Sequence, residues 1–225
     1  MGRIFIDHDL AEKRYVFTDR THAGLVVARM LAKWRGHSEE AVVLAIPAGG
    51  VPVGLAIARA LGLPFDLLFI RKLHFPDNPE SGFGAVSEHG EVLLNEHLAR
   101  LLDRKTIERQ IAIEKEALEA RIRRLRRLHP AMDLTGRTAI ITDDGLASGF
   151  TMLAAIAEAR ARGATSVIVA VPTASRQAAE RVAEAADALY VANLRSGQWF
   201  AVAEAYTAWR DLSLEEVERM LEQRP

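Results

Sequence analysis

Short, continuous apolar runs recur along the chain and alternate with turn-forming residues. The clearest runs are AVVLAI, RTAIIT, SVIVAVP and ALYVAN, at residues 41–46, 137–142, 166–172 and 188–193. Such a run, without polar alternation, is typical of a strand covered on both faces, as in a parallel sheet. A further strand is expected at FDLLFIRKL, residues 65–73, directly after Pro64.

Segments with helical spacing of apolar residues lie between these runs. Residues 19–35 are predicted to form a helix capped by Asp19 or Thr21, whose side chains can accept from free N–H groups of the first turn. Further helices are expected at residues 53–62, 103–128, 150–162 and 175–186. Strands alternating with helices predict an α/β protein with a parallel twisted sheet flanked by helices.

Two segments interrupt this alternation. Residues 74–90, HFPDNPESGFGAVSEHG, are rich in turn-forming residues and predict a long loop that is functional or mobile. EVLLNEH, which follows, is expected to add a strand. The last segment holds two of the three tryptophans and an amphipathic helix. We expect a single domain, with a core of about residues 19–192 and a small C-terminal hood lobe of about residues 193–225 that can include residues 1–18.

The composition narrows the classes of function. The chain has 225 residues, 49% of them hydrophobic, which is enough for one sizeable core. A formal net charge of −1 gives no general attraction to nucleic acid or to an anionic membrane. The lack of cysteine excludes disulfides and thiol catalysis. No signal peptide and no membrane-spanning apolar run is visible, so we expect a cytoplasmic protein that binds neither nucleic acid nor membrane.

Polar groups gather in IITDDGLASGFT, residues 140–151, where a predicted strand ends. In open parallel sheets, ligands bind beyond the carboxyl ends of the strands. The small residues leave N–H groups free for an anion, the helix dipole favours one, and Ser148 and Thr151 add hydroxyls. Asp143 and Asp144 suit hydroxyl donors or a hydrated cation. A phosphorylated sugar with a vicinal diol satisfies both halves, and the alternative is an exposed loop whose Asp caps the next helix.

This stretch resembles the phosphoribosyl pyrophosphate (PRPP) motif of type I phosphoribosyltransferases, in particular a subgroup whose motif reads nearly VDDGxATGxTM. The resemblance extends to PAGGVPVG as the pyrophosphate loop, RKL at 71–73 as a basic strand end, NPESGFGAV for NPELAxGAV, and WFAVAEAY for FxAVGxWY. Departures are Ser148 for Thr, Phe150 for a small residue, Ser81 for Leu and Ala203 for Gly. The resemblance implies the type I phosphoribosyltransferase fold over most of the chain.

The family's reaction implies roles for these residues. A nitrogen acceptor, usually a nucleobase, displaces pyrophosphate at C1 of PRPP with the help of Mg²⁺. Asp143 and Asp144 would be catalytic, holding ribose hydroxyls and, through water, the metal. The 5′-phosphate would be bound by Ala147, Ser148, Gly149, Phe150 and Thr151. Pyrophosphate would be bound by Ala48, Gly49 and Gly50, with Arg71 and Lys72 as cations, although alternate residues of a strand face opposite ways and one of the two can be a surface charge. A non-proline cis peptide, frequent in this loop of the family, is expected near Ala48–Gly49.

The same resemblance places a lid and an acceptor site. Residues 74–90 match the position of the family's mobile lid, with His74, Ser87 and Glu88 as candidates, and a solvated loop histidine is the alternative for His74. A small planar nitrogenous acceptor is expected against the hood, on Trp199 and Phe200. Tyr206 and Trp209 are alternatives, and for all four the other interpretation is a lobe core. Ala147 stands where 6-oxopurine members carry a proton-accepting Asp, which disfavours hypoxanthine and guanine.

Two further interpretations concern partners and the overall role. The basic run RIRRLRRLHP, residues 121–130, is interpreted as a solvated helix end, because cations favour helix C-termini and acidic residues precede it at pairing distance. RNA binding is the alternative. Family members commonly pair, so we expect a homodimer that acts in nucleotide salvage. The alternative function is a regulatory protein that uses the PRPP site as a sensor without robust transferase activity.

Overall fold

The computed structural model describes residues 2–197 and 199–223, except for the side chains of residues 79 and 80. Its centre is a six-stranded sheet in the order β1-β9-β8-β7-β2-β3, and all of its strand pairings are parallel. The strands are β1 (Arg3–Ile6), β2 (Ala41–Ala45), β3 (Phe65–Leu67), β7 (Thr138–Thr142), β8 (Ser166–Ser175) and β9 (Ala188–Arg195). The predicted α/β architecture is therefore confirmed.

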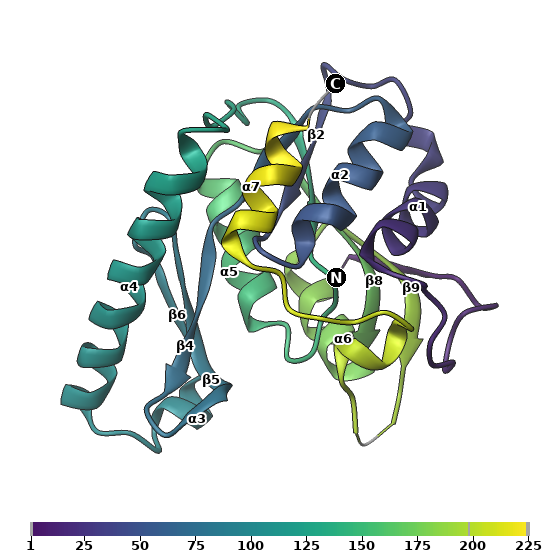
Figure 1. Ribbon diagram of the computed structural model, residues 1–225. Helices are drawn as coiled ribbons and strands as arrows, with labels where there is room; N and C mark the ends of the chain where they lie inside the picture. The colour runs from purple at the N-terminus through teal and green to yellow at the C-terminus, as the bar shows by residue number, and fades with distance from the viewer. Residues whose placement is uncertain (1, 198, 224–225) are drawn as a thin grey trace.

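Helices cover both faces of this sheet (Figure 1). They are α1 (Arg20–Met30) and α2 (Gly50–Leu61) on one face, and α5 (Phe150–Ala161) and α6 (Arg176–Ala185) on the other. A 3₁₀ turn, η1 (Ala32–Trp34), ends the segment predicted as one helix from residue 19. Asp19 caps α1 by accepting from the His22 N–H at 2.8 Å, as expected. Among the described helices, none combines the length and the apolarity needed to cross a bilayer.

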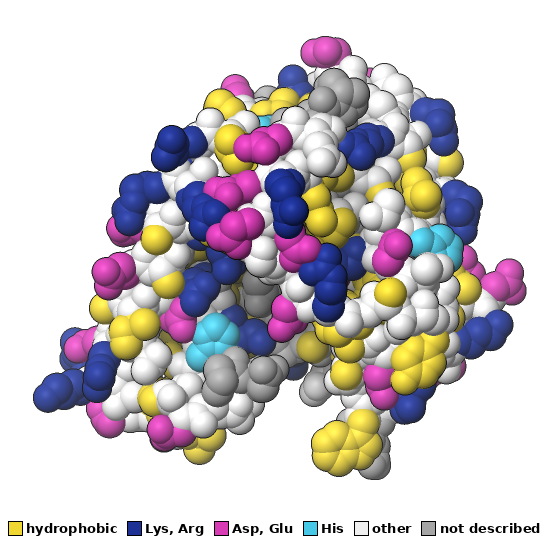
Figure 2. Space-filling model, in the orientation of Figure 1, with side chains coloured by type: hydrophobic (Ala, Val, Ile, Leu, Met, Phe, Trp, Pro, Cys, Tyr) yellow, Lys and Arg dark blue, Asp and Glu magenta, His cyan; other side chains and the backbone are white. Residues whose placement is uncertain are grey.

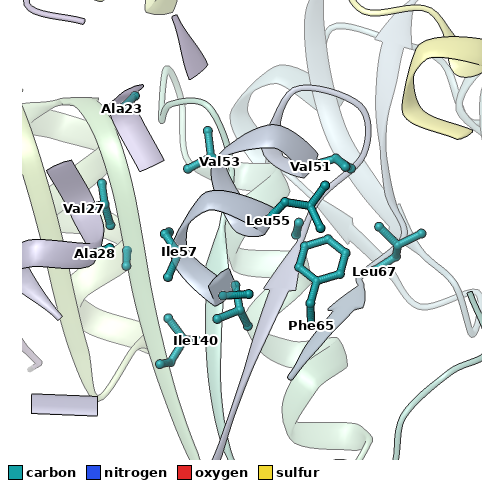
Figure 3. Close-up of a cluster of buried hydrophobic side chains, with 14 of the residues drawn as sticks. Ala23, Val27, Ala28, Val51, Val53, Leu55, Ile57, Phe65, Leu67 and Ile140 are labelled. Atoms are coloured by element: carbon teal, nitrogen blue, oxygen red, sulfur yellow. The ribbon is translucent and has the colours of Figure 1, made fainter. Parts of the chain in front are cut away.

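Two hydrophobic cores follow from the alternation of side chains along each strand. Val43 of β2 packs with α1 and α2, whereas its neighbours Val42 and Leu44 pack with α5 and α6. Figure 3 shows the first core, where side chains of α1 and α2 such as Val27 and Ile57 meet the sheet. Because both faces of β2 are covered, the strand has to be apolar throughout, which is the pattern that the sequence shows.

Residues 70–126 form a second layer, whose helix at 103–128 and strand at 91–97 were predicted but whose antiparallel sheet was not. The strands β4 (Ile70–Phe75), β5 (Asn78–Ser87) and β6 (Val92–Leu94) form an antiparallel sheet, covered by α4 (Arg104–Arg126) after the short α3 (Glu96–Ala99) (Figure 1). We call residues 70–126 the α4 lobe. The loop predicted for residues 74–90 is wrong, since most of it is β5. The strand predicted for residues 65–73 is two strands in two sheets.

The glycines of β5 explain this error. A Cβ at Gly84 would lie 2.5 Å from the Leu93 carbonyl oxygen, and one at Gly82 would overlap the Lys72 side chain. These glycines permit close strand pairing, a role that local composition does not distinguish from that of a turn residue.

The N-terminus is shared between the main sheet and the hood. Residues 3–6, assigned to the hood from the sequence, instead form β1, which extends the main sheet alongside β9. The next residues do join the C-terminal segment: the Phe17 N–H donates to Ala205 O at 2.9 Å, beside the 3₁₀ turn η2 (Val202–Ala205). The last helix is α7 (Leu214–Glu222), which begins with a capping box at Ser213 and Glu216.

A buried carboxylate joins the α4 lobe to the core. Asp66, in the edge strand β3 of the main sheet, is 0% exposed. Its Oδ1 accepts from Arg126 Nη1 at 2.6 Å, and its Oδ2 accepts from Arg162 Nη2 at 2.9 Å. Arg126 also pairs with Glu88 at 3.0 Å. One carboxylate therefore connects the end of α4 and the β5–β6 turn with the end of α5.

We expect Asp66→Asn to lower the free energy of unfolding by about 3 kcal/mol, because two largely buried guanidinium groups lose the negative charge they share. Urea denaturation monitored by circular dichroism measures this. Glu108→Gln, which removes an exposed helical ion pair with Arg104, is the control and should leave the midpoint unchanged. Equal midpoints for both variants would contradict this account of the lobe's attachment.

Candidate functional site

The acidic pair and the glycine loop, far apart in the chain, lie in direct contact. Asp143 and Asp144 follow β7, and residues 46–49 follow the neighbouring β2. A Cβ at Gly49 would overlap the Asp144 carboxylate, and one at Gly50 would lie 3.0 Å from Asp143 Cα. Only glycine allows this approach, so the structure brings together the two motifs singled out in the sequence.

Arg20, which the sequence analysis missed, holds Asp144. Its Nε lies 2.9 Å from Asp144 Oδ2, and its Nη1 donates to Arg210 O at 2.8 Å. The guanidinium also lies 3.9 Å from the Trp209 ring centroid. Arg20 is the first residue of α1, where the helix dipole disfavours a cation. This unfavourable position could have indicated, from the sequence, that Arg20 has a specific anionic partner.

The two carboxylates influence each other's ionisation. Burial and the neighbouring charge of Asp144 raise the pKa of Asp143 well above its usual value. Burial also raises the pKa of Asp144, while the charge of Arg20 opposes the rise. A cation or a pair of hydroxyl donors at this position would favour the charged forms. In the described part of the chain, no three His, Asp or Glu side chains are grouped to hold a metal alone, so an ion here would need water and substrate oxygens as well.

The loop after the acidic pair has the form of an anion cradle. Ala147 and Ser148 are exposed, Gly149 adopts φ +83°, and α5 begins at Phe150. Among the described residues, no side chain caps this helix end. Its first N–H groups, together with the half-buried Thr151, are therefore available to an anion.

Arg181 of α6 adds a positive charge to this cradle. It donates to the Ser148 carbonyl oxygen, and its guanidinium lies 4.9 Å from the Phe150 ring centroid. Phe150, the bulky departure from the motif, therefore provides a face on which a cation rests. The sequence analysis missed Arg181, and the aromatic at a position of small residues was the signal for it.

The glycine loop contains the expected non-proline cis peptide, one bond earlier than predicted. It joins Pro47 to Ala48, whereas the sequence analysis placed it near Ala48–Gly49. Helix α2 begins at Gly50, again without a side-chain cap among the described residues. The N–H groups of Gly50 and Val51 donate within the loop, to Ile46 O at 3.0 Å and Ala48 O at 3.1 Å. A second helix end thus lies beside the acidic pair, with its first turn closed by its own backbone.

The basic strand end divides its two cations between different partners. Arg71 pairs with Glu114 of α4, and His74 Nδ1 lies 2.8 Å from the other oxygen of that carboxylate. Burial acts to raise the pKa of Glu114, but the hydrogen bonds from His74 and Arg71 act against burial, and the pKa is lowered overall. Lys72 instead acts on Asp143. Burial raises the pKa of that carboxyl group, and the charge of Lys72 opposes the rise in part. Neighbouring residues of one strand thus serve different partners, as strand alternation predicts.

The remaining lid candidates, Ser87 and Glu88, lie where the α4 lobe joins the core and not over the site. Ser87 is buried, and its Oγ has no hydrogen-bond partner among the described residues. Glu88 pairs with Arg126 in the Asp66 cluster. The sequence analysis placed both on a mobile loop, because it did not predict β5, which ends at Ser87, or the turn after it, which holds Glu88.

Among the hood aromatics, Trp199 is exposed, Tyr206 is buried, and Phe200 and Trp209 are half-buried. Trp199 is 85% exposed, and Phe200 lies 5.1 Å from the Arg195 guanidinium carbon. Tyr206 is buried and donates its hydroxyl to Asp144 O at 2.6 Å, while burial raises its pKa well above the usual value. Its ring lies 5.1 Å from that of Trp209. The alternatives Tyr206 and Trp209 are therefore the aromatics in contact with the motif and with Arg20.

The basic run on α4 is only partly the predicted solvated face, since Arg123, Arg124 and Arg127 are exposed whereas Arg121 and Arg126 are partly buried. Arg121 Nη1 donates to Pro47 O at 3.2 Å, Arg124 pairs with Glu215 of α7 at 2.9 Å, and Arg126 pairs with Asp66. Figure 2 shows basic and acidic side chains interleaved where α4 and α7 lie close. Arg123, paired with Glu119 at 3.5 Å, keeps the exposed position predicted for the whole run. The order of charges along the sequence does not show that α4 contacts three different neighbours, which are the glycine loop, α7 and β3.

Comparison with known proteins finds a matching family model, similar sequences and a similar solved structure. A family model described as "Phosphoribosyl transferase domain" matches residues 18–208. Two Mycobacterium tuberculosis proteins, named "Putative phosphoribosyl transferase MT0597" and "Putative phosphoribosyl transferase Rv0571c", are each 40% identical over 212 residues, 92% of this chain and 46% of theirs. The chain thus spans about half the length of these curated relatives. The crystal structure of TT1426 from Thermus thermophilus is 38% identical, covers 92% of this chain and 98% of its own, and superposes with a TM-score of 0.74.

We expect Gly49→Ala to lower the free energy of unfolding by about 1–3 kcal/mol, because the new methyl group has to displace the Asp144 carboxylate from Arg20. Gly197→Ala is the matched control, since among the described residues its Cβ would meet only Trp199 O, at 3.5 Å. Urea denaturation measures both. If Gly49→Ala unfolds at the midpoint of the unmodified protein, the packing described for this loop is wrong.

Proposed function

The chain belongs to the phosphoribosyl transferase family, and on that premise we propose that it transfers ribose 5-phosphate from PRPP to a nitrogen acceptor and releases pyrophosphate. The contact between the Gly49 loop and the Asp144 carboxylate carries this proposal. This contact gathers a diol-binding acidic pair, an anion cradle at α5 and a second helix end at α2 around one space. PRPP has a diol, a 5′-phosphate and a pyrophosphate in the same arrangement along the sugar.

The reaction assigns each of these parts a task. The acceptor nitrogen forms a bond to C1 while the C1–O bond to pyrophosphate breaks, and its electron pair stays on the pyrophosphate. The acceptor then loses a proton to water or to a neighbouring base. Asp143 and Asp144 stabilise the positive charge that develops on the ribose and hold its hydroxyl groups. The cradle at residues 147–151 fixes the 5′-phosphate, so that C1 is held in position for attack.

The residues present fit a hydrated Mg²⁺. Asp143 and Asp144 lie side by side at the strand end, and the side chain of Asp144 remains 17% exposed, so water can stand between the carboxylates and an ion. Magnesium keeps several waters and takes the rest of its ligands from phosphate oxygens. When bound, the ion neutralises charge on the pyrophosphate as it leaves.

The acceptor is proposed to be a small planar nitrogen heterocycle beside the hood. The site residues Trp199 and Phe200 stay candidates for stacking on it, and Tyr206 and Trp209 stand closer to the acidic pair. Ala147 provides no proton acceptor, which disfavours hypoxanthine and guanine. We further propose that the protein acts in nucleotide salvage in the cytoplasm as a homodimer.

We expect pyrophosphate release when PRPP, Mg²⁺ and a panel of nucleobases and related rings are supplied, with hypoxanthine and guanine among the poor acceptors. Asp144→Asn should lower kcat/KM by about 100-fold, because it removes the charge that faces the reacting sugar. Asp187→Asn, at an exposed carboxylate paired with Arg160, is the control and should retain full activity.

Two outcomes would redirect this proposal. Full activity in Asp144→Asn would contradict the role given to the acidic pair, and rapid turnover of hypoxanthine would contradict the inference from Ala147. Tight PRPP binding without pyrophosphate release across the panel would favour the sensor.

A further inference from the structure

Arg121 stands at the glycine loop although it belongs to a helix of the α4 lobe. Its Nη1 donates to the Pro47 carbonyl oxygen at 3.2 Å. Pro47 directly precedes the residues 48–50 to which pyrophosphate binding is assigned. The lobe therefore delivers a guanidinium group to the edge of the proposed leaving-group site.

The charges around Arg121 are not balanced. Among the described side chains, which do not include those of residues 79 and 80, Arg121 forms no ion pair with a carboxylate, whereas Arg71 and His74 share Glu114. Burial and the like charge of Arg71 lower the pKa of Arg121, and Glu114 opposes them only in part. One carboxylate thus faces two guanidinium groups and a histidine.

A partly buried cation beside another cation is unfavourable unless an anion completes the cluster. Figure 2 shows a hollow between the α4 lobe and the rest of the molecule, with basic side chains on its walls. The charge of Lys72 reaches Asp143 from the same strand that carries Arg71. The lobe therefore directs positive charge toward the acidic pair.

We propose that Arg121 binds the pyrophosphate group of PRPP and stabilises it as it leaves, which makes α4 part of the transferase site. This inference rests on the proposed function. Arg121 is placed to add a charge-assisted hydrogen bond to a phosphate oxygen while Arg71 stays held by Glu114. The electron pair of the broken C1–O bond then rests on an oxygen close to a fixed positive charge.

Calorimetric titration with pyrophosphate in the presence of Mg²⁺ tests this assignment. Arg121→Gln should weaken pyrophosphate binding by about 10- to 100-fold, the loss of one charge-assisted hydrogen bond. Binding of ribose 5-phosphate, which lacks the pyrophosphate group, should change by less than about twofold. Arg123→Gln, on the exposed side of the same helix, is the matched control and should bind both ligands as the unmodified protein does.

The outcomes separate this inference from the function on which it rests. If the unmodified protein binds neither pyrophosphate nor PRPP, the proposed function fails. If it binds both and Arg121→Gln binds pyrophosphate equally well, the role of Arg121 alone is overturned. An equal loss of both ligands would mean that Arg121 only supports the loop, and would overturn the assignment too. Should Arg121→Gln fail to fold, Arg121→Lys replaces it, with a smaller loss expected for pyrophosphate only.

Discussion

The ion pair between Arg20 and Asp144 organises the site and the elements around it. It joins the start of α1 to the end of β7, and the same guanidinium reaches the Arg210 carbonyl and the Trp209 ring. Without this partner, two adjacent carboxylates at a half-buried strand end would repel each other. Because Arg20 also contacts the hood, it connects the acidic pair to the hood.

Positive charge is delivered to the site from three separate elements. Arg20 comes from α1, Arg181 from α6 and Arg121 from α4, and each contacts a backbone or carboxylate oxygen of a site segment. Each guanidinium is therefore positioned before any ligand arrives, which reduces the entropy lost on binding. A ligand with negative charge at two ends suits such an arrangement better than a neutral one.

Much of the sheet and part of the site could be predicted from the sequence, and the rest could not for physical reasons. Strands such as β2 and β7 are apolar because both their faces are covered, and that requirement is visible in one dimension. The glycines of the Gly49 loop were also informative, since close backbone approach leaves few other choices. The sheet of the α4 lobe was missed because its glycines serve strand pairing, although its long helix was predicted. The contact of Arg121 was missed because its partner is a backbone carbonyl that no charge pattern reveals.

The passage from β3 to β4 has a consequence for how this molecule can move. The residues between these strands, Leu68 and Phe69, are 0% exposed, and the Arg126 guanidinium lies 4.8 Å from the Phe69 ring centroid. A rigid-body hinge needs a joint that can change its backbone angles without uncovering apolar surface. This joint lies inside the core, so a change in its backbone angles would uncover apolar surface and is disfavoured.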